Sequence, residues 1–236
     1  MSVQDRINDY WSGRAGAYDD HQRRPDRFED DQRAWGRIWT DALPAAPADV
    51  LDLGTGSGYV ALLLAQLGHR VTGIDLAEPM LQRARGHAAD LPSGVRAPEF
   101  RPGDAVRPDF PDGSFDAVVG RYVAWTLRQP RDAASAWLRL LRPGGTLALV
   151  DSTWFPDGID ERESMMAGHY DAEVRAALPL HDASSIDATA ATVRAAGFTD
   201  VRVVPLTDVL ELDRRYGVAP NHEVQLQYLV HGRRPG

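Results

Sequence analysis

Residues 49–58 read Asp-Val-Leu-Asp-Leu-Gly-Thr-Gly-Ser-Gly, a short apolar run that leads into glycines at every second position. An apolar stretch at 59–67 follows at once and predicts a helix, which Gly68 is placed to end. The run at 49–53 therefore predicts a buried strand that turns on glycines into a helix. Such a turn brings bare backbone and a helix N-terminus against a bound ligand.

The chain beyond this turn alternates between apolar strands and helices. Near-continuous apolar strands separated by helices indicate a parallel sheet that is covered on both faces. We therefore predict an α/β fold with a doubly wound, mostly parallel sheet. Further strands are expected at 70–75, near 99–101, at 115–120 and at 146–151, and further helices at 78–85 and 132–141.

The segments that flank this core depart from the alternation. After a helix at 187–196, two late strands are expected at 201–206 and 225–230. No crossover helix is expected between them, so one strand of this tight pair is predicted to be antiparallel. The chain is thus expected to form one domain over 1–236, with an N-terminal helical lid (1–43), a ligand-binding core (49–151), a substrate-cap insertion (152–184) and a C-terminal helix and strand pair (185–236).

Composition narrows the classes of function. Hydrophobic residues make up 43% of the chain and charged residues 25%, as in ordinary globular proteins. The formal net charge of −8 makes nucleic acid and anionic membranes poor partners. The chain has no cysteine, which excludes disulfides, zinc–thiolate sites and cysteine nucleophiles. We expect a cytoplasmic protein without a targeting segment or a metal site, either a monomer or a homodimer.

The spacing of the glycines helps to identify the ligand. Dinucleotide sites use G-x-G-x-x-G, whereas here Tyr59 stands where that pattern requires glycine. Asp75 ends the second strand, where a carboxylate can accept hydrogen bonds from both hydroxyls of a ribose. Asp104 follows the third strand; it can accept from an adenine amine or simply form a turn.

Five stretches in this order resemble the motifs of class I S-adenosylmethionine-dependent methyltransferases. The resemblance covers 49–151 and extends more loosely to the segments on either side. It implies S-adenosylmethionine as the cofactor and a seven-stranded sheet in the order 3-2-1-4-5-7-6, with strand 7 antiparallel. The stretches are residues 50–58, Asp75, 103–105, 115–118 and 141–145.

The resemblance also implies which residues hold the cofactor. The glycine turn would approach its methionine part and ribose, the acid after the second strand would hold the ribose hydroxyls, and apolar side chains would sandwich the adenine. A residue after the fourth strand would lie beside the sulfonium, and an N-terminal tyrosine would close over the methionine carboxylate. The full set is Tyr18, Asp52, Gly54, Thr55, Gly56, Gly58, Asp75, Leu76, Met80, Asp104, Ala105 and Arg121.

The methyl acceptor is predicted to be a small, ring-bearing molecule of the secondary-metabolite type. Residues 120–123 read Gly-Arg-Tyr-Val. In this family an Asn/Asp-Pro-Pro-Tyr/Phe run there marks methylation of DNA bases or protein glutamine, so those acceptors are not expected. The predicted acceptor residues share an aromatic or apolar character, which suits a ring. They are Tyr10, Tyr122, Trp125, Trp154, Met165 and Tyr170.

A hydroxyl acceptor would need a general base, and histidine suits neutral pH. We predict His169 as this base, with His181 as the second candidate and His21 as the third. Two other functions stay open on the sequence alone. One is an S-adenosylmethionine-binding protein that does not transfer methyl groups, and the other is an NAD(P)-dependent oxidoreductase.

Overall fold

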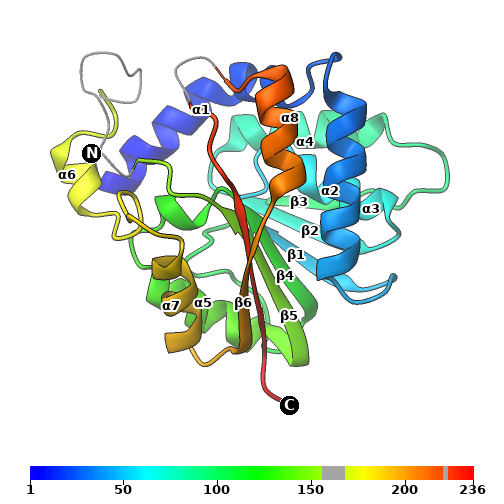
Figure 1. The fold of residues 1–236 in the computed structure, drawn as a ribbon. Helices are drawn as coiled ribbons and strands as arrows, with labels where there is room; N and C mark the ends of the chain where they lie inside the picture. The colour runs from blue at the N-terminus through cyan, green and yellow to red at the C-terminus, as the bar shows by residue number, and fades with distance from the viewer. Residues whose placement is uncertain (156–167, 220–222) are drawn as a thin grey trace.

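The computed structural model describes residues 1–155, 168–219 and 223–236. The strands in this part of the chain form one sheet in the order β3-β2-β1-β4-β5-β7-β6 (Figure 1). Strand β7 is antiparallel to both β5 and β6, and the remaining pairs are parallel. The predicted sheet order and its antiparallel strand are confirmed. The strands are β1 (Asp49–Leu53), β2 (Arg70–Asp75), β3 (Glu99–Pro102), β4 (Phe115–Arg121), β5 (Leu141–Asp151), β6 (Thr199–Pro205) and β7 (Tyr228–Arg233).

Helices cover both faces of the sheet (Figure 1). Helices α2, α3, α4 and α8 share one apolar core with one face, and α5 and α7 share a second core with the other face. Helix α1 crosses the carboxyl-terminal edge of the strands, with α6 beside its beginning. The helices are α1 (Val3–Gln22), α2 (Phe28–Ala42), α3 (Tyr59–Gln66), α4 (Glu78–Ala89), α5 (Pro130–Leu140), α6 (Ala172–Ala176), α7 (Asp187–Ala195) and α8 (Thr207–Tyr216), with a 3-10 turn η1 (Ala124–Thr126) after β4.

The central strand β1 shows why its sequence is continuously apolar. Val50 and Leu51 are both fully buried, but Val50 belongs to the core under α3 and Leu51 to the core under α5. Because successive side chains of a strand point to opposite faces, a strand covered on both sides needs apolar residues at neighbouring positions.

The N-terminal segment divides into two helices with different environments. Trp35 and Trp39 of α2 are 2% and 0% exposed and lie in the core on the sheet. Burial of two such large side chains fixes α2 against the sheet. The predicted lid over 1–43 does not include α2, which is a core helix. A lid role for α1 stays a prediction.

The C-terminal segment contains a helix that was not expected from the sequence. The connection from β6 to β7 includes α8, whose Val209 is 1% exposed and packs in the core beside α2. The prediction of a strand pair without an intervening helix is wrong. The sequence hint was an apolar residue at 209 with a glycine stop at Gly217, which is compatible with a short amphipathic helix.

Several strand limits also differ from the predictions. β6 and β7 are shifted relative to 201–206 and 225–230, and β5 begins at Leu141 instead of residue 146. The early start reflects pairing of Leu141 with Phe115 of β4 across an irregularity in register. A prolyl-glycine sequence normally reads as a turn, so periodicity alone does not locate this start.

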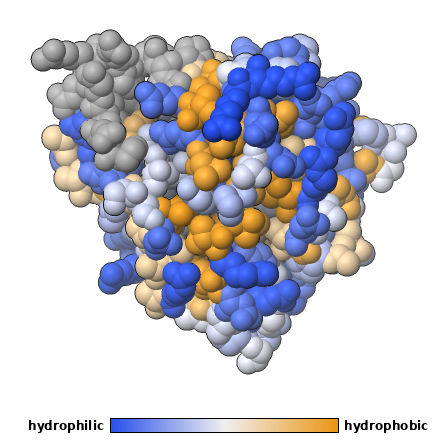
Figure 2. Space-filling view, in the orientation of Figure 1, coloured by the Kyte–Doolittle hydropathy of each residue, from blue (hydrophilic) through white to orange (hydrophobic). Residues whose placement is uncertain are grey.

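The sheet ends at β6, whose outer side has no neighbouring strand within the described residues. Figure 2 shows hydrophobic residues gathered in the middle of this face, over β6. Val204 on this strand is 43% exposed.

No helix among the described residues is long and apolar enough to cross a membrane. Whether the protein is a monomer or a homodimer stays a prediction.

Candidate cofactor and acceptor site

The glycine turn between β1 and α3 has a left-handed backbone at two positions that face a cavity. Gly54 has φ 59° and Gly56 has φ 54°, conformations that other residues adopt only at a cost. A Cβ on Gly54 would lie 2.7 Å from Val123, whereas a Cβ on Gly56 would meet only Met80 Sδ, at 3.9 Å. Gly54 is thus required by packing, and Gly56 leaves its backbone open to a ligand.

Gly58, predicted with these two, has a different position. It is the N-cap of α3 with φ 83°. A Cβ there would lie 2.9 Å from Phe100 and 3.0 Å from Ala84, so Gly58 permits close packing of α3 on β3 and α4. It does not line either cavity described below.

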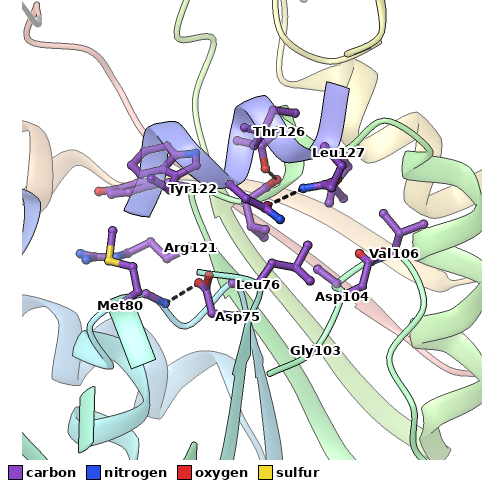
Figure 3. Close-up of a pocket in the computed structure, with 18 of the residues that line it drawn as sticks. Asp75, Leu76, Met80, Gly103, Asp104, Val106, Arg121, Tyr122, Thr126 and Leu127 are labelled. Carbon is purple, nitrogen blue, oxygen red and sulfur yellow. Dashed lines mark hydrogen bonds between the residues drawn. The ribbon is translucent and has the colours of Figure 1, made fainter. Parts of the chain in front are cut away.

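The cavity lies at the carboxyl-terminal edge of the strands, beneath α1, and has a volume of about 770 Å³ that is open to solvent (Figure 3). In open α/β sheets, ligands bind at this edge. Nine of the predicted cofactor residues line it together. They are Tyr18, Gly54, Gly56, Asp75, Leu76, Met80, Asp104, Ala105 and Arg121.

Asp75 connects the glycine turn to the second strand. Its Oδ2 accepts from the backbone N–H of Gly56 at 2.9 Å, and its Oδ1 accepts from that of Ala77 at 2.8 Å. Burial raises the pKa of the carboxyl, and the two backbone hydrogen bonds oppose that rise. A carboxylate has about four acceptor sites, so this one can still receive the two hydroxyls of a ribose.

Two side chains beyond Asp75 give the cavity an apolar wall and a polar edge (Figure 3). Leu76 is 39% exposed, which is unusual for a leucine next to a buried strand. Asp104 accepts from the N–H of Val106 at 2.8 Å and also lines the cavity. An exposed leucine and a carboxylate at one end of a cleft fit a planar base with an exocyclic amine.

A second cavity of about 270 Å³ adjoins the first, with Gly54, Gly56, Tyr18 and Arg121 in both walls. It also contains the predicted residues Asp52 and Thr55. Asp52 is 1% exposed, and its Oδ2 accepts from Thr55 Oγ1 at 2.6 Å. Burial raises the pKa of Asp52 to about 7.

Arg121 carries a positive charge into the wall shared by the two cavities. Its guanidinium lies over three aromatic rings, 5.1 Å from the centroid of Trp35, 4.5 Å from Tyr59 and 4.8 Å from Tyr122. Within residues 1–155, 168–219 and 223–236 it makes no ion pair with a carboxylate. Aromatic faces stabilise a guanidinium without neutralising it, so Arg121 can still bind an anion.

Helix α1 supplies cavity residues that the sequence analysis did not identify. Gln4, Ile7, Asn8 and Trp11 lie in the cavity wall together with the predicted Tyr18. Their spacing of three and four residues places them on one helical face. That spacing was visible in the sequence, but it could not show which surface the face would cover.

Asp19 fixes the end of α1 nearest the glycine turn. Its carboxylate is 2% exposed and accepts from Arg83 Nη1 at 3.0 Å, and His87 Nε2 lies 2.8 Å away. At the other end, Arg6 pairs with Asp171 at 2.6 Å beside α6. Helix α1 is therefore attached at both ends across the cavity.

The predicted acceptor residues lie in two different places. Tyr122 lines the larger cavity, whereas Tyr10, Trp125 and Tyr170 form a buried cluster beside it. The Trp11 ring connects the two, at 6.3 Å from the Trp125 ring. Trp154 also packs against this cluster, and the predicted Met165 lies outside the described residues.

The two leading candidates for the base differ in burial. His169 is exposed, with its ring 5.5 Å from that of Tyr10. His181 is 2% exposed and stacks on Phe155 at 4.8 Å, and neither of its ring nitrogens has a hydrogen-bond partner in the described part of the chain. Burial lowers the pKa of His181 and favours its neutral form. Neither histidine lines the cavities.

Asp151, which the sequence analysis did not identify, organises the acceptor side. It ends β5 at 1% exposure and accepts from Trp154 Nε1 at 2.5 Å and, more weakly, from the N–H of Trp125 at 3.3 Å. Burial raises its pKa to about 6.

The described residues contain no group of three or more metal-ligating side chains that could hold a metal ion.

Comparison with known proteins places this site in a family. Residues 51–149 match the model of a methyltransferase domain. The nocamycin O-methyltransferase of Saccharothrix syringae is 33% identical over 178 residues, which are 67% of this chain and 62% of that protein. The demethylmenaquinone methyltransferase of Beutenbergia cavernae is 36% identical over 154 residues, 60% of each chain. The chain thus spans about three fifths of the length of these curated relatives.

A solved structure agrees at the level of the fold. A SAM-dependent methyltransferase from Aquifex aeolicus is 20% identical, with a TM-score of 0.62 over 94% of this chain and 98% of that one. The match at 51–149 includes the glycine turn, Asp75, Asp104 and Arg121, the groups that the folded chain brings to one edge of the sheet. Residues 51–149 therefore form a methyltransferase domain, in a chain that has the fold of the class I S-adenosylmethionine-dependent methyltransferases.

Proposed function

We propose that the protein transfers a methyl group from S-adenosylmethionine to an oxygen or nitrogen atom of a small, ring-bearing molecule. The observation that carries the proposal is the junction at Asp75. One carboxylate is fixed by the Gly56 N–H in the cavity wall and is followed at once by the exposed Leu76. This junction presents a ribose-binding acid and a base-stacking surface side by side.

The residues divide the cofactor between the two cavities. Asp75 would hold the ribose hydroxyls, Leu76 and Met80 would contact the adenine, and Asp104 would accept from its amine. The smaller cavity suits the amino-acid tail, because Arg121 offers a cation for its carboxylate beside the left-handed backbone of the turn. When bound, the cofactor supplies an activated methyl group on a sulfonium; the protein has to align the acceptor with it.

The aromatic residues of the cavity wall support a ring-bearing acceptor. Trp11 and Tyr122 line the cavity, with Trp125 and Tyr170 buried behind them, and flat apolar surfaces of this kind favour planar molecules. The relatives are named for nocamycin and demethylmenaquinone, and we extend to this chain only the class of small molecule. We assign acceptor contacts to Tyr122 in the cavity wall and to Trp154, whose ring packs against it.

The predicted base His169 stays part of the proposal, with His181 as the alternative. A base acts by removing the proton of an acceptor hydroxyl and contributes a factor of about 10²–10⁴ to the rate. His169→Ala with full turnover would exclude His169. His181→Phe keeps a ring against Phe155 and removes only the nitrogens, so loss of turnover in that variant would assign the role to His181.

The proposal is tested by supplying labelled S-adenosylmethionine to the protein with a metabolite extract. We expect label to enter one small molecule, whose mass identifies the acceptor. Absence of transfer, despite measurable binding of S-adenosylhomocysteine, would favour a cofactor-binding protein without methyl transfer. A matched Asp75→Asn protein serves as the control, because it should lower labelling without a change in fold.

A further inference from the structure

A buried polar chain begins at Tyr122 in the cavity wall and leads away from the site. The Tyr122 hydroxyl donates to Gln227 Oε1 at 2.5 Å, and Gln227 Nε2 donates to Asp213 Oδ2 at 3.0 Å. Asp213 Oδ1 then pairs with Arg27 Nη1 at 2.7 Å. Gln227 and Asp213 are 5% and 4% exposed. Buried groups linked in this way depend on one another, because an unpaired member costs free energy.

Tyr122, at the start of this series of polar contacts, has an unusual backbone conformation. Its φ is 63°, in the left-handed region that a tyrosine rarely adopts. Its N–H donates to the carbonyl of Val150 at 2.8 Å, which fixes the backbone, and among the described residues its hydroxyl bonds to Gln227 alone. Strained residues at functional sites persist where the surrounding structure determines them.

The ring of Tyr122 lies between the donor side and the acceptor side of the site. Arg121 lies 4.8 Å from its centroid, and Figure 3 shows the two side chains at the same end of the cavity. The Trp154 ring also packs edge-on against that of Tyr122, with the two centroids 5.0 Å apart. A shift of this ring would therefore move both the cation and the aromatic wall.

The side-chain amides of Gln225 and Gln227 contact the acceptor side and the donor side of the site, respectively. Gln225 Nε2 donates to the carbonyl of Trp154 at 3.2 Å, while Gln227 holds Tyr122. In an extended segment, residues two apart share a face. The segment that leads into β7 thus contacts both residues that flank the junction between the cavity and the aromatic cluster.

We propose that Gln227 is a positioning residue of the site, which sets the orientation of the Tyr122 ring and, through it, of Arg121 and Trp154. This inference rests on the proposed function, because it assigns those two side chains to the cofactor and the acceptor. It places part of the site's control in α8 and the approach to β7, far from the glycine turn in sequence.

The test compares Gln227→Leu and Tyr122→Phe by calorimetric titration with S-adenosylhomocysteine. We expect each single change to raise the dissociation constant about three- to tenfold, since each breaks the same hydrogen bond. The double variant should lose no more than the weaker-binding single variant, because residues that act through one contact are not additive.

Gln227→Glu adds a readout that a structural role alone would not give. A protonated glutamic acid can accept from Tyr122 and donate to Asp213, as glutamine does, whereas an ionised one repels Asp213. Affinity for S-adenosylhomocysteine should therefore recover as the pH falls, relative to wild type at the same pH.

Tyr216→Phe is the matched control. Tyr216 lies on α8, as Asp213 does, and its hydroxyl donates to Asp30 at 2.7 Å without a link to the cavity. The variant should bind S-adenosylhomocysteine with an unchanged dissociation constant, even if its melting temperature falls. If Gln227→Leu and Tyr122→Phe also leave the dissociation constant unchanged, as the control does, the positioning role is wrong. If wild type itself does not bind S-adenosylhomocysteine, the proposed function fails instead.

Discussion

The donor half and the acceptor half of the site are built in opposite ways. The donor half comes from the ends of β1, β2, β3 and β4, where each strand brings its own polar group to the two cavities. The acceptor half is assembled from α1, the turn after β4, the residues after β5 and the segment around α6, which meet through aromatic contacts.

This difference explains what each half can tolerate. In the donor half, a residue is positioned by its own strand and a few backbone hydrogen bonds, so its role is local. In the acceptor half, each ring is held by rings from distant segments, so a change at one position is transmitted to the others. We expect single changes in the donor half to affect the cofactor strongly and selectively.

The largest expected effect is on the free energy of unfolding, through the buried carboxyl of Asp52. Its pKa is about 7 in the folded protein and near 3.8 when exposed, so the folded state retains a proton that the unfolded state has released. The contribution of Asp52 to the free energy of unfolding should therefore fall as the pH rises from about 4 to 7, by at most about 4 kcal/mol. Asp52→Asn should lack this fall.

Thermal melts of both proteins across this pH window measure the effect. The melting temperature of Asp52→Asn minus that of wild type should increase as the pH rises, by roughly 2–4 °C per kcal/mol. Parallel melting curves would mean that Asp52 is ionised in the folded protein, and that the donor half carries no such cost.

Asp75→Asn should weaken S-adenosylhomocysteine binding about ten- to a hundredfold, since hydrogen bonds to a charged group contribute about 1.5–3 kcal/mol. Calorimetric titration measures the change. Glu78→Gln is the control, because that exposed acid on neighbouring α4 pairs with Arg85 outside the cavity. Equal affinity in all three proteins would remove Asp75 from the site.

Arg121→Met should weaken binding of the same ligand about tenfold, because the carboxylate of the amino-acid tail loses its cation. The affinity of Arg121→Lys should lie between those of Arg121→Met and wild type, since lysine keeps the charge without the planar guanidinium. Binding of adenosine alone, which has no carboxylate, should be the same in all three proteins. A matching loss for adenosine would mean that Arg121 only supports the wall.

The smallest effect is expected from Trp154→Phe, which tests the acceptor half. The variant keeps a ring against Tyr122 but loses the hydrogen bond to Asp151. We expect labelling of the acceptor to fall a few-fold, in line with about 1 kcal/mol for one hydrogen bond, and S-adenosylhomocysteine affinity to stay constant. A loss of cofactor affinity with normal labelling would contradict the division into two halves.

The donor half could be predicted from the sequence because its signals are short-range. Asp75 ends a strand, the glycine turn and Asp104 follow one, and a parallel sheet brings strand ends to one edge. Gly58 is the exception, since its packing on Phe100 depends on how α3 meets the sheet.

The acceptor half was less predictable because it depends on how separate segments dock. The sequence indicated aromatic residues, but not that Trp125 and Tyr170 would pack behind the cavity while Asn8 of α1 lined it. Gln227 gave no local signal, because a buried amide is recognisable only once its partners are in place. Asp151 ends an apolar strand, as Asp75 does, but that signal could not show that it would bond to Trp154.

Titration of the wild-type protein with S-adenosylhomocysteine, S-adenosylmethionine and NADH tests the central claim most directly. The glycine spacing, the Asp75 junction and the amino-acid-sized cavity beside Arg121 predict that the first two ligands bind at one site per chain and that NADH does not compete. Tight binding of NADH without binding of the other two would contradict the account.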